Sequence, residues 1–197
     1  MSGHFEPLPG GGAAVPLDEV EISILRSLAV QLMELIGPGG EAGESESDDL
    51  LASVFNDGPS EPPADPVLAR FFPDAYGGPD LVPDDDVRAA SAEFRRYTEN
   101  DLRSRKREDA LALIRALDTL APEGGSAELR LKPAECRQWL GALNDLRLAI
   151  GTRLEVTDEE DGGELLRLPD SDPRKPMVMA YLWLGGLQET LVESLMG

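Results

Sequence analysis

The sequence predicts a mainly α protein: a helical bundle with a small N-terminal β-hairpin and a third short strand near 128–132. Aromatic residues make up only 5% of the chain, so the core must consist mainly of Leu, Val, Ile and Ala. Leu and Ala favour helices over sheets. Apolar residues recur at helical spacing in several long segments, whereas alternating or extended segments are short and bounded by Gly and Pro.

The N-terminal segment predicts a hairpin followed by a helix. Residues 4–8 and 13–17 are short extended segments on either side of a Pro-Gly-Gly-Gly turn. Asp18 stands three residues before Glu21, a capping-box spacing, and leucines and isoleucines then recur at helical intervals up to Ile36. We therefore predict a helix over 18–36, ended by Gly37-Pro38, and a flexible acidic linker of Gly, Glu and Ser at about 37–47.

Two short helices, at 48–55 and 65–72, precede a long helix over 84–120 whose apolar face changes side. The predicted packed side in its first half contains Val87, Ala90, Phe94 and Tyr97, whereas Leu113, Ile114, Leu117 and Leu120 fall on roughly the opposite side. Residues 103–109 between them contain no apolar side chain. The pattern predicts either a kink there or a helix whose halves pack against different partners.

The C-terminal third predicts one strand and two helices. Leu129 and Leu131 alternate with charged residues, which is typical of a strand that could join the hairpin. Pro133 suits the first turn of a helix, and an acidic turn follows at 158–163. A last helix over 173–195 is apolar on most sides at 177–187, which places it at the centre of the core, and its Gly185-Gly186 pair indicates close helix packing or a kink. The stripe of the preceding helix is Trp139, Leu143, Leu146, Ile150 and Leu154.

Length and charge indicate one domain over 1–197 in the cytoplasm. The formal charge is −20, and residues 1–87 carry 18 acidic but only two basic side chains. Such a chain is repelled at long range by nucleic acid and by anionic lipid. No leader sequence is visible, and the most apolar run, 177–184, is far shorter than the ~20 residues that span a bilayer. We expect no membrane association.

The residue types predict no catalytic, metal or cofactor site. The chain has one histidine, His4, near a terminus, and one cysteine, Cys136, so nucleophilic and zinc arrangements lack their components. Cys136 is a weak candidate for redox chemistry, because Glu135 disfavours its thiolate and Arg137 favours it. We therefore expect a binding protein rather than an enzyme.

A basic band at 88–107 is the main candidate for a partner-binding site. It holds seven basic and three acidic residues in an otherwise acidic chain. Most of its bases fall in an arc of roughly 120° opposite Phe94 and Val87. Three interpretations stay open: a solvated face with Glu99–Arg103 and Asp101–Arg105 pairs, neutralisation of the acidic N-terminal half, or docking of an acidic protein or a phosphate backbone. The docking hypothesis assigns partner binding to Arg88, Arg95, Arg96, Arg103, Lys106 and Arg107.

Several segments resemble the AosR family of actinobacterial proteins. They are FEPLPGGG at 5–12, EPPADPVL at 61–68, EFRRYTEND at 93–101, WLGALNDLR at 139–147 and DPRKPMVMAYLWLGGLQET at 172–190. The resemblance implies regulation of transcription under oxidative stress through a sigma factor of the extracytoplasmic-function type and RNA polymerase, with DNA contacted only indirectly. A homodimer is a further option. The alternative is a partner of the Clp proteolysis machinery or another non-catalytic interaction protein.

The resemblance also implies a redox trigger, which the family is described as forming from a pair of cysteines. This chain departs from that pattern, because Ser2 and Ser53 are serines and Cys136 is its single cysteine. An intramolecular disulfide switch is therefore impossible in this protein.

Overall fold

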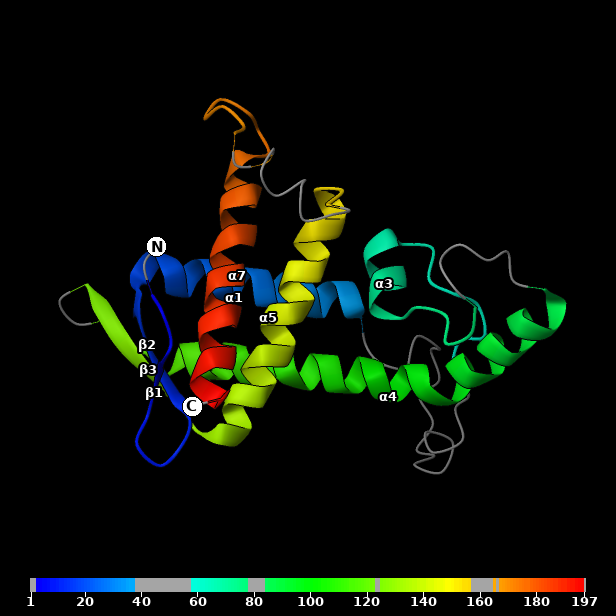
Figure 1. The fold of residues 1–197 in the computed structure, drawn as a ribbon, viewed down its shortest axis with the longest axis horizontal. Coiled ribbons are helices and arrows are strands. Elements are labelled where there is room, and N and C mark those ends of the chain that lie inside the picture. Colours follow the sequence, from blue (N-terminus) through cyan, green and yellow to red (C-terminus); the bar gives the residue numbers. More distant parts are fainter. Residues whose placement is uncertain are drawn as a thin grey trace, which may run out of the picture. The chain divides into compact units, whose positions relative to one another are not determined.

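A computed structural model describes residues 3–37, 58–77, 84–122, 125–156, 165 and 167–196. Within these residues the chain forms five helices and one antiparallel sheet in the order β1-β2-β3 (Figure 1), which confirms the mainly α fold. The predicted helix at 48–55, the acidic turn at 158–163 and all of the 37–47 linker except Gly37 lie outside the described residues.

The chain divides into two compact units. The sheet unit comprises Met1–Met33 and Glu108–Gly197, and the α3 unit comprises Glu34–Arg107. Helices α1 and α4 each contribute residues to both units. The single domain over 1–197 remains a prediction.

The sheet of the sheet unit confirms the predicted hairpin and third strand. β1 (Glu6–Pro7) and β3 (Ser126–Leu131) both pair antiparallel with the central strand β2 (Ala13–Asp18). The turn between β1 and β2 depends on Gly12, whose φ is +91°. A Cβ atom there would lie 2.2 Å from the Leu131 carbonyl oxygen, so only glycine allows β3 to approach this closely.

Helix α1 (Glu19–Ile36) begins with the predicted capping box. The Asp18 backbone N–H donates to Glu21 Oε2 at 3.0 Å, and the Glu21 N–H donates to Asp18 Oδ1 at 2.8 Å. Two backbone donors that the helix leaves unpaired are thereby satisfied. Leu25, Ala29 and Leu32 form the buried face, as their spacing predicts.

Replacement of Asp18 with alanine should lower the free energy of unfolding by about 1 kcal/mol, because the Glu21 N–H loses its acceptor. Urea denaturation measures this change. The exposed Gln31, in the middle of the same helix, provides the control, since its replacement with alanine should change stability by less than about 0.5 kcal/mol. Equal effects of the two substitutions would contradict the capping role.

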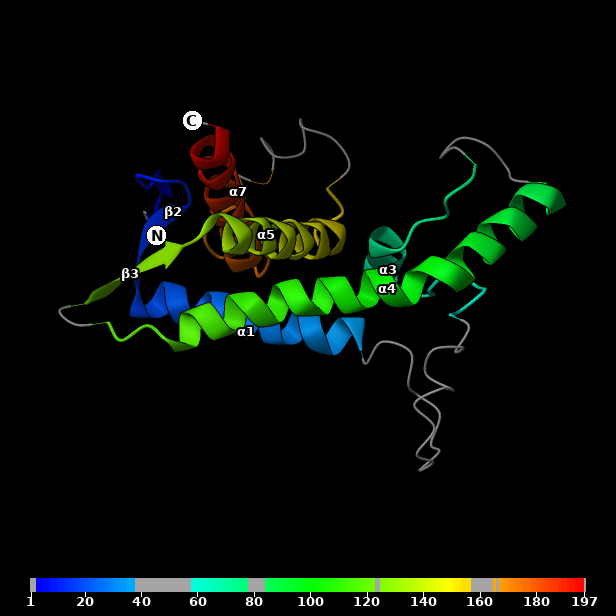
Figure 2. The same cartoon turned by 90° about the horizontal axis from the view of Figure 1, so that it is seen from below.

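Helices α5 (Pro133–Arg153) and α7 (Lys175–Met196) lie side by side and form one layer of the sheet unit (Figures 1 and 2). In these views α1 and the end of α4 run alongside each other in a second layer of that unit. Pro133 occupies the first turn of α5 as predicted. The predicted stripe of α5 is entirely buried: Trp139, Leu143, Leu146, Ile150 and Leu154.

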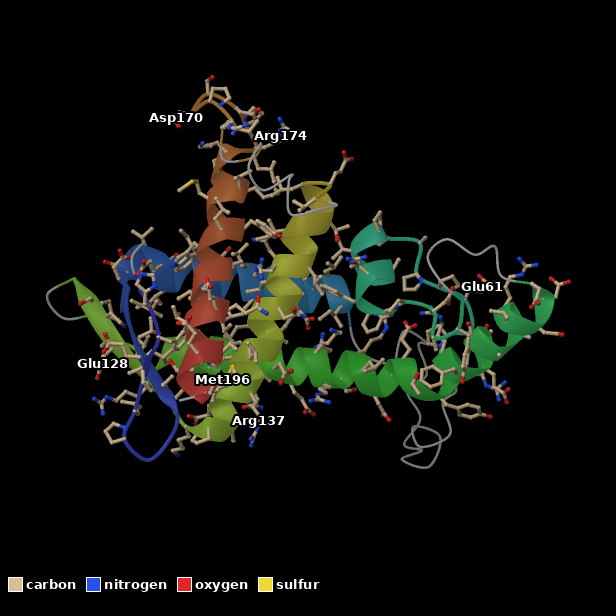
Figure 3. The ribbon with its side chains drawn as sticks, in the orientation of Figure 1. Glu61, Glu128, Arg137, Asp170, Arg174 and Met196 are labelled. Atoms are coloured by element: carbon tan, nitrogen blue, oxygen red, sulfur yellow. The ribbon has the colours of Figure 1, made fainter. Side chains whose placement is uncertain are left out.

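Helix α7 has a buried face and an exposed one. Val178, Leu184, Leu187 and Leu191 are buried, which confirms its place in the core. Met177 and Met179 are 37% and 40% exposed, so the prediction of a segment buried on most sides is wrong at this end. Figure 3 shows Arg174 at the start of the helix, where it forms an ion pair with Asp172, and Met196 at its end.

The Gly185-Gly186 pair does not mediate close backbone packing, and α7 continues through it without a break. A Cβ atom on Gly185 would meet Arg147 Nε at an ordinary 3.5 Å, and one on Gly186 would meet nothing within 4 Å. The missing side chains instead leave an open groove of about 530 Å³ between α5 and α7. The interpretation of this pair as a site of close helix packing is therefore wrong.

Helix α4 (Asp85–Asp118) is continuous, and the first half of its predicted apolar pattern is wrong. Leu113, Ile114 and Leu117 are buried in the sheet unit as predicted. In the α3 unit, by contrast, Phe94 and Tyr97 are exposed. The buried residues of that half are Ser91, Arg95 and Glu99. The alternative in which the two halves pack against different partners is the one that holds.

None of the helices in the described part of the chain is both long and apolar enough to cross a bilayer.

Candidate functional site

The buried face of α4 in the α3 unit is an ion-pair network centred on Arg95 and Glu99. These side chains are only 4% and 2% exposed, and Arg95 Nη1 lies 2.6 Å from Glu99 Oε2. Arg95 also donates to the Phe72 carbonyl oxygen at 2.9 Å and to Asp74 Oδ1 at 2.8 Å. Burial by itself favours neutral Arg95, but hydrogen bonds to Asp74 and Glu99 outweigh it and raise the pKa of the guanidinium.

Arg103, Lys106 and Arg107 extend the network toward α3 (Pro66–Phe71) and the end of α1. Arg103 donates to Glu99 Oε1 and to the Ile36 carbonyl oxygen, with its guanidinium carbon 4.5 Å from the centre of the Phe72 ring. Arg107 donates to the Gly37 carbonyl oxygen at 2.7 Å. The Lys106 ammonium lies 5.1 Å from the centre of the Phe71 ring. These side chains therefore satisfy the C-terminal carbonyls of α1 and cover the aromatic residues that end α3.

The structure exposes only part of the predicted cationic docking face. Arg95 is buried, and Arg103 and Arg107 are bonded within the α3 unit. Arg88 and Arg96 are the exposed members of the predicted set. Of the two predicted pairs, Glu99–Arg103 is present, whereas Asp101–Arg105 does not appear among the described residues. Arg95, Arg103 and Arg107 thus contribute to the packing of the α3 unit. Whether any of the six predicted residues binds a partner remains a prediction.

The opposite side of α4 exposes an aromatic cluster of Tyr76, Phe94 and Tyr97. The three side chains are 50%, 44% and 61% exposed. Tyr76 and Phe94 contact each other edge to face, with ring centres 6.0 Å apart. The backbone of Tyr76 is held on α4 by Ser91, whose hydroxyl accepts from the Tyr76 N–H and donates to its carbonyl oxygen. The cluster is therefore fixed in place although it is open to solvent.

Three exposed carboxylates accompany these rings. Asp86, Glu93 and Asp101 share one helical face with Tyr97, at intervals of seven, four and four residues. Among the described residues, no ion pair involves any of the three. Arg96 lies at the edge of this face and stacks on Tyr97, with its guanidinium carbon 5.2 Å from the ring centre. We refer to Tyr76, Phe94, Tyr97, Asp86, Glu93 and Asp101 as the aromatic–acidic face.

The shape of this region suits a macromolecule better than a small ligand. The pocket beside Phe94 and Leu102 holds only about 30 Å³, far below the roughly 300 Å³ typical of ligand sites. The part of the chain that the structure describes contains no group of three His, Cys, Asp or Glu side chains placed to bind a metal ion. Exposed, rigid aromatic side chains with charged neighbours are instead typical of protein interfaces.

Cys136, the weak redox candidate, lies in the core of the sheet unit. Its side chain has no exposed surface, and its thiol donates to the Leu131 carbonyl oxygen at a sulfur–oxygen distance of 3.8 Å. Burial is the main reason that the pKa of the thiol is raised; Glu135 adds to this effect, and together they outweigh the lowering effects of backbone hydrogen bonds, chiefly from Ala13, and of Arg137. A buried thiol that keeps its proton is a poor nucleophile toward oxidants.

In the folded protein, Cys136 should therefore react with a thiol reagent at least about 100-fold more slowly than after denaturation, because it is both inaccessible and protonated. The folded thiol binds its proton more tightly than the unfolded one, whose pKa is about 8.5. Tighter proton binding by the folded thiol therefore contributes fully to the free energy of unfolding below the unfolded pKa. This contribution declines as the pH rises above that value. Rapid labelling of the native protein at pH 7 would contradict this description, and Cys136→Ser provides the blank.

The apolar pattern of the sequence did not predict the aromatic–acidic face, because it predicted that Phe94 is buried. Two signals were nevertheless available. Glu99 stands four residues from both Arg95 and Arg103, the spacing of a continuous ion-pair row. The carboxylates and Tyr97 form a second row on the other side of the helix. If the row of Arg95, Glu99 and Arg103 is buried, this second row must be exposed.

Comparisons with known proteins cover almost the whole chain. The family described as "Domain of unknown function (DUF2017)" matches residues 2–195. Proteins named "Oxidative stress regulator AosR" from Mycobacterium bovis and Mycobacterium tuberculosis are 34% identical to the chain over 183 residues, which is 90% of this chain and 79% of theirs. A Mycobacterium leprae protein named "Putative oxidative stress regulator AosR" is 33% identical over 181 residues, 89% of this chain and 79% of its own. No solved structure matches the chain.

Proposed function

We propose that this chain, which belongs to the DUF2017 family, is a regulator of the oxidative-stress response that acts by binding a sigma factor or RNA polymerase. The similarity to the mycobacterial AosR proteins over 90% of the chain carries this proposal. The proposal assigns to this chain the role in oxidative-stress regulation that the names of those proteins state. The sigma factor and the polymerase are the partners that the family resemblance implies.

The regulator works by association and not by catalysis. Its surface offers a rigid aromatic cluster with exposed carboxylates, which supports binding to another protein. The formal charge of −20 opposes direct association with DNA, so contact with a promoter occurs through the partner. Sigma factors and polymerase are cytoplasmic in bacteria, and the regulator acts in the same compartment.

The oxidant signal does not enter through a disulfide within this chain. The chain has one cysteine, and that thiol is buried with a raised pKa.

The experiment that tests this function uses the tagged full-length chain in its native host, with and without oxidant. Co-purified proteins are identified by mass spectrometry, and direct binding is then measured with the purified host sigma factors and core RNA polymerase. Direct binding of one of these, together with altered transcription of oxidant-response genes when the chain is deleted, supports the proposal. Recovery of Clp components alone, or no direct binding to any sigma factor or to core polymerase, would reject it.

A further inference from the structure

We infer that the aromatic–acidic face of α4 is the partner-binding surface, and that it binds a basic protein segment whose apolar side chains cover Phe94 and Tyr97. The inference rests on the proposed function and specifies the site and the chemistry of the contact. It replaces the basic band as the expected docking surface.

The face has the rigidity and extent of an interaction site. Asp86 and Asp101 mark its ends, and the helix rises about 22 Å from one to the other. Tyr76 is held against Phe94 by the Ser91 hydrogen bonds, and Tyr97 is held by Arg96, whose Nη2 donates to the Tyr97 hydroxyl at 3.2 Å. Aromatic side chains that are already ordered lose little entropy when a partner covers them.

The charge of the face selects the partner. Asp86, Glu93 and Asp101 flank the rings, with Arg96 as the opposing charge beside Tyr97. Residues 1–87, which include Asp86, carry a net charge of −16 and make the long-range field of the chain acidic. A segment rich in Lys and Arg is therefore attracted to this face, whereas a DNA backbone or a second copy of the same acidic face is repelled. Segments of this kind are common in proteins that bind nucleic acid.

The other side of the same helix segment is not available to a partner. Arg95 and Glu99 are buried there, and Arg103 is bonded to Glu99 and to the end of α1. Displacing them would leave buried charges unpaired. In the α3 unit, the exposed residues of α4 thus include the aromatic rings and the carboxylates, together with Arg88, Arg96 and Arg105.

The test measures the affinity of purified full-length variants for the purified host sigma factors and for core RNA polymerase. The double variant Phe94→Ser/Tyr97→Ser should lose about 30-fold or more in affinity, as expected when two central aromatic contacts are removed. Met177→Ser/Met179→Ser provides the matched control, since these apolar side chains are similarly exposed on α7. It should bind like the unaltered chain.

A second variant tests the charge without removing the rings. Glu93→Lys/Asp101→Lys should weaken binding about tenfold at low salt and less at high salt, because exposed charges act through a screened field. Circular dichroism confirms that each variant is folded.

The possible outcomes separate the two claims. If the unaltered chain binds a sigma factor or the polymerase but Phe94→Ser/Tyr97→Ser binds equally well, the inferred surface is wrong and the proposed function stands. If the methionine variant loses binding instead, the site lies on α7. If charge reversal at Glu93 and Asp101 strengthens binding, the partner segment is not basic. If the unaltered chain binds none of these proteins, the proposed function fails and the inference fails with it.

Discussion

Glu99→Ala should destabilise the α3 unit by about 3–5 kcal/mol, because it removes the buried carboxylate beside buried Arg95 and leaves the half-exposed Asp74 to pair with it. Glu99 Oε2 accepts from Arg95 and Oε1 from Arg103, so one substitution removes two charge-assisted hydrogen bonds. Hydrogen exchange of the amides in 66–71 and 91–107 should increase sharply. This readout isolates the unit from the rest of the chain.

Glu93→Ala is the control for this prediction, because Glu93 has the same side chain on the exposed side of the same helix. It should change stability by less than about 0.5 kcal/mol. Similar exchange in the two variants would mean that the Arg95–Glu99 pair does not organise this unit.

Trp139→Ala should destabilise the sheet unit by about 3–5 kcal/mol, the usual cost of removing a large buried aromatic side chain. Trp139 is almost fully buried in α5 and contacts Phe5 edge to face, with ring centres 6.1 Å apart. It therefore connects the N-terminal segment before β1 to the helical core. Urea denaturation followed by circular dichroism measures the loss.

Trp139→Phe separates the aromatic contact from the indole N–H. Within the described structure, Trp139 Nε1 is buried without a hydrogen-bond partner, so its removal should relieve an unfavourable burial. We expect this variant to lose less than about 1.5 kcal/mol, because that relief offsets part of the lost contact area. A loss as large as that of Trp139→Ala would show that the indole nitrogen is in fact bonded.

Short sequence patterns predicted most helices and strands, because the interactions that start and end these elements involve residues only a few positions apart. The Asp18–Glu21 capping box, the Gly12 turn and the Pro133 start of α5 depend on neighbours in the sequence. The stripe that includes Trp139 and Leu146 depends only on helical spacing, and the structure confirms it.

The orientation of the first half of α4 was not predictable in the same way. The usual rule that apolar side chains lie inside points to Phe94, and the structure places Arg95 there instead. The reason is the set of partners that Arg95 finds in Phe72 and Asp74, more than 20 residues earlier in the chain. Such partners can be identified only once the fold brings these segments together.

The sequence pattern predicted that basic side chains cover one exposed side of α4, and the structure buries Arg95, a central member of that set. Of the basic residues in this band, Arg95, Arg103 and Arg107 are bonded to internal carboxylates or to carbonyl groups at the end of α1. Gly185 and Gly186 are a similar case, since their sequence indicated close helix packing and the structure shows an open groove.

Arginines of α4 are bonded within the α3 unit, and we expect the aromatic–acidic face on the other side of the helix to bind the partner. The most direct test compares two double variants for affinity to the same purified sigma factor or polymerase: Phe94→Ser/Tyr97→Ser, and Arg88→Gln/Arg105→Gln, which neutralises exposed arginines of the basic band and leaves the Arg96–Tyr97 contact in place. We expect the aromatic variant to lose binding and the arginine variant to bind as well as the unaltered chain or more tightly, since a basic partner gains from the lost positive charge. Loss of binding in the arginine variant with retention in the aromatic one would contradict the account.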